Sequence, residues 1–138
     1  MEYIIIGAGS RGMTYGLWAK EHGIKIAAIA EIRPERLKSA AKELGVPENR
    51  QFSDARELLS LGKIADAAII ATMDRDHYGH VMQALDCGYD ILLEKPISPD
   101  PKECAIWKLP MFSACLMATT FPISPESIIS FNCWKKLV

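Results

Sequence analysis

The stretch that most constrains this chain is GAGSRG, residues 7–12, a G-x-G-x-x-G pattern close to the amino terminus. It follows an apolar run at residues 3–6, whose β-branched side chains predict a strand buried on both faces. A helical pattern begins at Arg11 and continues to His22, so the glycines lie at a strand-to-helix turn. A glycine-rich turn in this context is typical of a dinucleotide-binding βαβ unit.

Each glycine of this turn has a distinct expected task. Gly7 permits the tight turn, Gly9 lets the backbone approach a pyrophosphate, and Gly12 lets the helix pack closely on the strand. We expect Ser10 and Arg11 to lie beside the phosphates, because a helix amino terminus offers free N–H groups and a partial positive charge. Two simpler interpretations stay open: the glycines form a purely structural turn, and the arginine is solvated.

An acidic residue ends the second predicted strand, residues 24–30, and it indicates which cofactor the turn serves. Glu31 lies 19 positions after Gly12. A carboxylate at this point can accept hydrogen bonds from the adenosine ribose and repels a 2′-phosphate, which favours NAD over NADP. Arg33 can accept a 2′-phosphate, so NADP stays possible. The alternative for Glu31 is an ordinary surface acid.

Strands and helices alternate along the first two thirds of the chain. Helical patterns follow at residues 34–44, 54–60 and 76–87, and strand patterns at 51–52, 66–72 and 89–93. Such alternation predicts a parallel sheet with helices on both faces, because right-handed crossovers place them there. We therefore predict a Rossmann-type, doubly wound α/β fold with three layers, α/β/α, in a single domain.

Composition excludes several other classes of protein. The 138 residues carry a formal net charge of −1, which argues against a nucleic-acid partner or a polybasic membrane surface. No apolar run approaches the roughly 20 residues that span a membrane, and the chain starts without a leader pattern, so we predict a cytoplasmic protein. The four cysteines form no C-x-x-C pair, and we expect no metal site.

Two further motifs, both after residue 70, add to the glycine turn and carry a family resemblance. The loop TMDRDH occupies residues 72–77 and EKP occupies 94–96. Together with GAGSRG and Glu31, and in this order, they make about residues 2–103 resemble the Gfo/Idh/MocA family of NAD(P)-dependent oxidoreductases. The resemblance implies a dinucleotide-binding domain at residues 1–103. It also implies chemistry on hydroxyl or carbonyl positions of sugars, inositols and related compounds.

The resemblance assigns residues 72–77 to the nicotinamide end of the cofactor. The family loop commonly reads T-P-N-x-x-H, and Thr72 and His77 match it, whereas Met73 replaces the proline and Asp74 the asparagine. Backbone contacts from Thr72 and Met73 are compatible with these changes, whereas Asp74 offers a carboxylate in place of the family's amide side chain. For His77 we expect contact with cofactor or substrate; the alternative is a plain residue of the first helical turn.

The E-K-P match implies the reactive group. The family's lysine, here Lys95, lies beside the nicotinamide and the reacting oxygen, where an ammonium can donate a proton and stabilise a developing alkoxide. Glu94 is expected to orient the loop or the cofactor amide, and Pro96 to fix the chain where it leaves the sheet. The alternative for Lys95 is a structural salt bridge at the end of a strand.

Residues 104–138 match neither domain of the family. Relatives bind substrate in a second domain with a D-x-x-x-H helix, but here no Asp follows Asp100 and no His follows His80. We interpret this stretch as an atypical tail, either out of frame or from a truncated gene. The rival hypothesis is a natural tail that packs as an extra hairpin or as a dimer surface.

Three functions are compatible with these patterns. The first is the NAD(P)-binding domain of an oxidoreductase that acts on a sugar- or polyol-like substrate. The second is a non-catalytic dinucleotide-binding or sensing module, which needs GAGSRG and Glu31 but no substrate site. The third is a CoA-binding or repressor-type domain, which E-K-P argues against. Self-association into a homo-oligomer stays open.

Overall fold

The structure is a computed structural model that describes residues 1–96, 98–100, 102–103 and 115–118. Its elements follow in chain order: β1 (Glu2–Ile6), α1 (Ser10–Glu21), β2 (Lys25–Ala30), α2 (Pro34–Leu44), the 3₁₀ turn η1 (Glu48–Arg50), β3 (Gln51–Phe52), α3 (Ala55–Leu59), β4 (Ala67–Ile70), α4 (Asp74–Asp86), β5 (Asp90–Glu94) and β6 (Cys115–Ala118).

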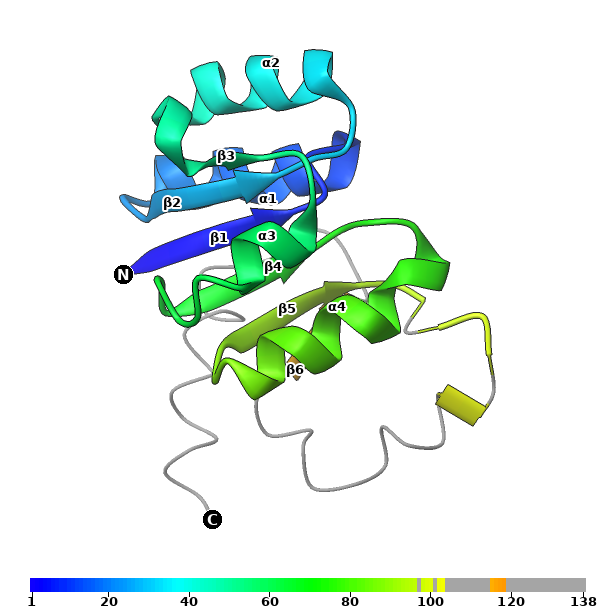
Figure 1. Ribbon diagram of the computed structural model, residues 1–138. Helices are drawn as coiled ribbons and strands as arrows, with labels where there is room; N and C mark the ends of the chain where they lie inside the picture. Colours follow the sequence, from blue (N-terminus) through cyan, green and yellow to red (C-terminus); the bar gives the residue numbers. More distant parts are fainter. Residues whose placement is uncertain (97, 101, 104–114, 119–138) are drawn as a thin grey trace.

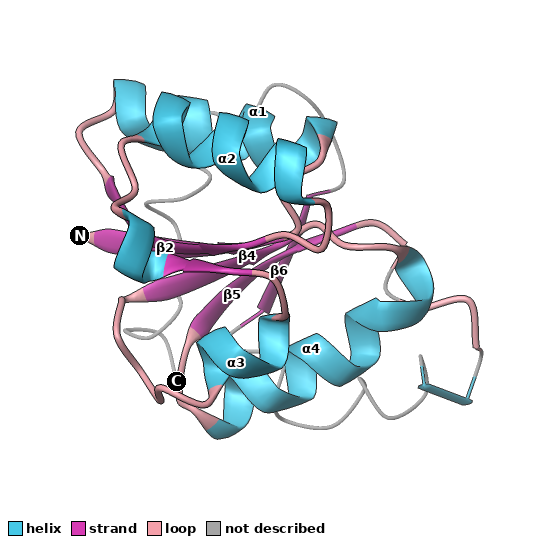
Figure 2. Cartoon of the chain, turned by 45° about the horizontal axis from the view of Figure 1, so that its top comes forward, coloured by secondary structure: helices cyan, strands magenta, loops and turns pink. Residues whose placement is uncertain are grey.

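The strands form one six-stranded sheet in the order β3-β2-β1-β4-β5-β6, and every pairing is parallel (Figure 1). Helices α1 and α2 cover one face, and α3 and α4 cover the other (Figure 2). This arrangement confirms the predicted three-layer Rossmann-type fold. The strand order reverses between β1 and β4, and ligands of open α/β sheets bind at such a switch point, beyond the carboxyl ends of the strands.

The alternation of side chains along each strand divides the core into two halves. In β1, Ile4 and Ile6 pack on the side of α3 and α4, whereas Tyr3 and Ile5 pack on the side of α1 and α2. Both halves are closed to solvent, since the three isoleucines of β1 are fully buried. A strand covered on both faces reads as a continuous apolar run, which is why β1 shows no polar alternation in the sequence.

Element boundaries differ from the predictions by a few residues. Helix α4 begins at Asp74, two residues earlier than predicted, because Met73 is extended and Asp74 and Asp76 favour the positive amino end of the helix. Helix α3 begins after Asp54, whose carboxylate accepts a hydrogen bond from the amide of Arg56 at 2.8 Å. Strand β5 includes Glu94, which matters for the site.

Strand β6 comes from residues that the sequence analysis assigned to the tail. It pairs in parallel with β5, from Ile91 opposite Cys115 to Glu94 opposite Ala118. The sheet therefore continues beyond the predicted domain limit at residue 103. The predicted tail hairpin or dimer surface lies outside the described residues. Within the part of the chain that the structure describes, no helix is both long and apolar enough to cross a membrane.

Candidate functional site

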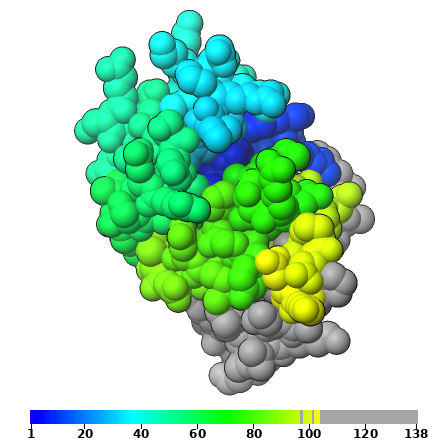
Figure 3. Space-filling view, turned by 45° about the vertical axis from the view of Figure 1, so that its right-hand side comes forward, coloured from blue at the N-terminus to red at the C-terminus, as the bar shows by residue number. Residues whose placement is uncertain are grey.

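The predicted site residues gather at the carboxyl edge of the sheet. They come from the β1–α1 loop, the residues after β2, the β4–α4 loop and the end of β5. Because parallel strands all end at the same edge, the topology brings these four segments together at the switch point. In the space-filling view, the dark blue β1–α1 loop is set back between cyan atoms of α2 and green atoms beyond β4 (Figure 3).

The three glycines of the loop are required for different reasons. Gly7 has φ +92°, and a Cβ there would lie 2.6 Å from the carbonyl oxygen of Ala71. A Cβ on Gly12 would lie 2.0 Å from the carbonyl oxygen of Gly7. At Gly9, in contrast, φ is −69° and a Cβ would meet only Nη1 of Arg36, at 3.7 Å. Protein sterics thus require Gly7 and Gly12, whereas the open space at Gly9 fits the close approach of a ligand.

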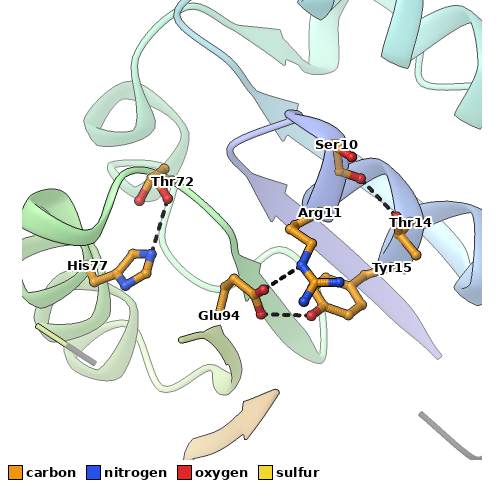
Figure 4. A network of polar contacts seen from close by, with 7 residues as sticks. All are labelled: Ser10, Arg11, Thr14, Tyr15, Thr72, His77 and Glu94. Carbon is orange, nitrogen blue, oxygen red and sulfur yellow. Dashed lines mark hydrogen bonds and ion pairs between the residues drawn. The ribbon is translucent and has the colours of Figure 1, made fainter. Parts of the chain in front are cut away.

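The amino end of α1 faces this open space. Gly9 is its N-cap and provides no side-chain hydrogen bond to the first turn. The first helical bond that closes runs from the amide of Met13 to the carbonyl of Gly9, at 2.9 Å. Ser10 is exposed, and its carbonyl accepts a hydrogen bond from the Thr14 hydroxyl (Figure 4). An uncapped amino terminus of this kind suits a phosphate group.

The carboxylate of Glu31 is only 7% exposed and lies against the glycine loop. One of its oxygens accepts the amide of Ala8 at 2.9 Å, and the other accepts the amide of Arg33 at 3.0 Å. A carboxylate has about four lone-pair sites, so each oxygen can still accept a ribose hydroxyl. The two amides hold the carboxylate at the edge of the glycine loop. This is the position from which an acid after the second strand of such a fold can bind a ribose hydroxyl.

Arg36, which no sequence motif singles out, also lies at the glycine loop. Its guanidinium lies beside the position of a Gly9 Cβ, whereas the contact of Arg33 with Glu31 is made by the backbone amide. Both arginines are exposed. Only the sequence position of Arg36, in the first turn of the helix after Glu31, signals its approach to the loop.

His77 ties the β4–α4 loop to the end of β5. The ring is fully buried, with Nδ1 2.7 Å from the carbonyl oxygen of Pro96 and Nε2 3.2 Å from that of Thr72. Both nitrogens thus face backbone carbonyls (the bond to Thr72 is drawn in Figure 4).

The Thr72 hydroxyl lies 3.2 Å from Nδ1 of His80, and burial lowers the pKa of His80. Met73 is 65% exposed.

Glu94 is the most enclosed polar group at the end of β5. Its carboxylate pairs with Nε of Arg11 at 2.7 Å and accepts the hydroxyl of Tyr15 at 2.7 Å (Figure 4). Burial, and then the bond to Glu94, raises the pKa of Tyr15.

Lys95 and Pro96, joined by a cis peptide bond, are exposed at the site edge. No cluster of candidate metal ligands occurs among the residues described here.

Comparisons with known proteins agree with this geometry. A family model for "Oxidoreductase family, NAD-binding Rossmann fold" matches residues 1–108. The chain is 33% identical over 107 residues to an inositol 2-dehydrogenase of Arthrobacter sp., a match that covers 76% of this chain and 30% of that protein. A second inositol 2-dehydrogenase, from Pseudarthrobacter chlorophenolicus, is 33% identical over 98 residues, which are 70% of this chain and 28% of the relative. The chain therefore spans about a third of the length of these relatives.

Solved structures share the fold. An oxidoreductase from Agrobacterium radiobacter in complex with NAD⁺, L-tartaric acid and magnesium superposes with a TM-score of 0.77 at 24% identity, over 88% of this chain and 36% of that one. The scyllo-inositol dehydrogenase of Lactobacillus casei, with bound NAD(H) and scyllo-inositol, gives a TM-score of 0.75 at 23% identity, over 86% and 36% of the two chains.

Proposed function

Because the chain belongs to the Gfo/Idh/MocA family of oxidoreductases, with the NAD-binding Rossmann fold of that family, we propose that it binds NAD(H) across the carboxyl edge of its sheet. One observation carries this proposal. The buried carboxylate of Glu31 is held against the glycine loop beside Gly9, the one loop glycine whose Cβ space the protein leaves open. An anion site and a ribose acceptor thus lie side by side, as a dinucleotide requires.

The adenosine half of the cofactor would lie over β1 and β2. The loop at Gly7, Gly9 and Gly12 and the first turn of α1, at Ser10 and Arg11, would hold the pyrophosphate. Glu31 would accept the ribose hydroxyls, which favours NAD. The backbone amide of Arg33 binds this carboxylate, and the guanidinium of Arg36 lies beside the position of a Gly9 Cβ. Either arginine would suit a 2′-phosphate, so NADP is the competing cofactor.

The nicotinamide half would lie over β4 and β5. The backbone at Thr72 and Met73 would form its floor, and His77 would hold this loop against the carbonyl of Pro96. In this proposal, His77 supports the pocket from within the protein, because its ring is buried and both nitrogens already face carbonyls. Glu94, paired with Arg11, would set the position of the residue that follows it.

The proposed reaction moves a hydride between the cofactor and a CH–OH carbon. The nicotinamide ring, when bound, accepts or supplies that hydride. In the oxidation direction Lys95 would accept the hydroxyl proton at Nζ, and in the reduction direction it would return a proton to the carbonyl oxygen. The lysine is exposed at the site edge. Inositol- or sugar-like compounds are the proposed substrates, since the curated relatives are inositol 2-dehydrogenases.

Isothermal titration of the full chain with NAD⁺, NADH, NADP⁺ and NADPH tests this proposal. We expect binding to the NAD pair and weaker binding to the NADP pair. Absence of binding to all four would contradict both the enzyme and the non-catalytic binding module. Tight binding without turnover across a panel of inositols and sugars, even when a substrate domain is supplied, would favour the module. A cytoplasmic location and self-association remain predictions from the sequence.

A further inference from the structure

The side of the sheet that Glu94 occupies follows from the alternation along β5. Ile91 and Leu93 belong to the core half beside α3 and α4, whereas Leu92 belongs to the half beside α1 and α2. Successive side chains of a strand point to opposite faces, so Glu94 shares the face of Leu92 and meets α1. The strand thus ends with a carboxylate directed at the helix that follows the glycine loop.

Two residues of α1 contact this carboxylate. Arg11 and Tyr15 are four positions apart, a spacing that places them on the same face of a helix. Each contacts a different oxygen of Glu94 at 2.7 Å, and Figure 4 shows both side chains converging on it. Glu94 is 7% exposed, and its carboxylate needs such partners because a buried charge without hydrogen bonds is strongly unfavourable.

Tyr15 is the more enclosed of the two partners. Tyr15 as a whole residue is 3% exposed, whereas the side chain of Arg11 is 46% exposed. The neighbouring Gly16 lets α1 lie close to the sheet, since a Cβ there would be 2.7 Å from Cδ1 of Ile5. The helix backbone that carries Tyr15 thus lies close to the strands, and its phenol hydroxyl reaches Glu94 at the end of β5.

We propose that Tyr15 is a positioning residue: through Glu94 it holds the end of β5 against α1 and so sets the place of Lys95 in the nicotinamide half of the site. The inference rests on the proposed function for what Lys95 does, but the tie between α1 and β5 stands on contacts of this chain. Arg11 and Tyr15 bind the same carboxylate, so α1, which follows the glycine loop, is joined to Glu94. Lys95 is the next residue in the chain, and the glycine loop and this lysine are therefore connected through Glu94.

This connection affects the two halves of the cofactor differently. The adenosine half depends on the glycine loop, Glu31 and the first turn of α1, and Arg11 of that turn keeps its own ion pair with Glu94 when the Tyr15 hydroxyl is removed. The nicotinamide half depends on the end of β5. Loss of the phenol hydroxyl should therefore loosen the nicotinamide half and spare the adenosine half.

The test compares Tyr15→Phe with the matched variant Tyr89→Phe in the full chain. Tyr89 is also buried, and its hydroxyl is also hydrogen-bonded, to the carbonyl of Gly62 and from the amide of Ile64, but it follows α4 and precedes β5 at the opposite edge of the sheet. Hydrogen exchange of the peptide covering residues 91–96 is measured without cofactor. Affinities for NADH and for ADP-ribose, which lacks the nicotinamide, are measured by titration calorimetry.

We expect Tyr15→Phe to speed exchange at the amides of Glu94 and Lys95 roughly tenfold. We also expect it to weaken NADH binding about tenfold while ADP-ribose binding stays within about twofold. Tyr89→Phe should lower the melting temperature without either effect. In a Glu94→Met background, Tyr15→Phe should change nothing further, because its partner is gone.

Unchanged exchange in Tyr15→Phe, or equal losses of NADH and ADP-ribose affinity, would overturn the positioning role. If the wild-type chain binds neither compound, the proposed function fails, and the exchange measurement still decides whether Tyr15 holds the end of β5.

Discussion

At the scale of single residues, the buried acids at the site edge differ in what they hold. Glu31 accepts two backbone amides, which fix it beside the glycine loop. Glu94 accepts two side chains from α1, which fix the end of β5. The first was predicted from its position after β2, because that position can be recognised in the local sequence. The partners of the second were not, since nothing in the neighbourhood of Glu94 names Arg11 or Tyr15.

Replacing Glu31 with glutamine should change the cofactor preference. The amide keeps one acceptor oxygen but loses the charge, and its NH₂ group faces one of the two backbone amides. Hydrogen bonds to charged groups contribute about 1.5–3 kcal/mol, so NAD⁺ affinity should fall roughly tenfold or more, with a smaller loss for NADP⁺. Calorimetric titration measures both constants. Glu35→Gln, an exposed acid in the first turn of α2, is the control and should leave them unchanged.

His80 should make the free energy of unfolding depend on pH. Burial lowers its pKa in the folded protein, and the nearby carboxylate of Asp76 opposes this only in part. Below the unfolded-state value of about 6.5, the unfolded chain then binds more protons than the folded one, so stability falls as pH decreases through that window. Urea unfolding of His80→Gln should show a shallower loss on the acid side of pH 6.5. A pH profile identical to wild type would contradict this.

At the scale of elements, α1 is placed by close contact rather than by large side chains. Gly12 and Gly16, one turn apart, both lie where a Cβ would penetrate the sheet or its loop. Small residues at this spacing let the helix axis approach the strands, which brings the amino end of the helix, without a side-chain cap, close to the carboxyl edge of the sheet. Helix α4 has no such restriction at Gly79, where a Cβ would meet nothing within 4 Å.

Alanine substitutions at Gly12 and Gly79 should have opposite effects on the free energy of unfolding. A Cβ on Gly12 would lie 2.0 Å from the carbonyl oxygen of Gly7, so Gly12→Ala should reduce the free energy of unfolding by at least about 2 kcal/mol and abolish NAD binding. Gly79→Ala should raise it by about 0.5–1 kcal/mol, because alanine is the better helix former and the space is open. Urea unfolding of both variants tests the pair. Equal effects would mean that α1 can shift away from the sheet.

At the scale of the whole molecule, the described residues form a doubly wound parallel sheet of six strands, with the predicted site residues at its carboxyl edge. Its match to the curated inositol 2-dehydrogenases covers about 30% of their length. All the site residues predicted for cofactor binding come from the described sheet and its loops. The family resemblance implies that the groups that shape a substrate pocket come from a second domain, which residues 104–138 do not resemble in sequence.

The 138-residue chain should therefore bind NAD⁺ but should not oxidise inositols at a measurable rate. Cofactor binding needs only the carboxyl edge of the sheet, whereas turnover also needs a surface that orients the substrate next to Lys95. The assay follows NADH formation with scyllo-inositol and myo-inositol, with the Arthrobacter inositol 2-dehydrogenase as positive control. Turnover by the chain alone would show that its own residues complete the substrate site.

The sequence by itself determined the order of strands and helices, the glycine loop and the acid after β2. These features depend on periodicity and turn chemistry over a few neighbouring residues, which is why the prediction of a Rossmann-type fold is confirmed. Only the tertiary structure decided that β6 extends the sheet, that Arg36 reaches the glycine loop and that His77 joins two loops. Tyr15 and Glu94 lie 79 positions apart, and their contact depends on strand order and helix packing, which no local pattern encodes.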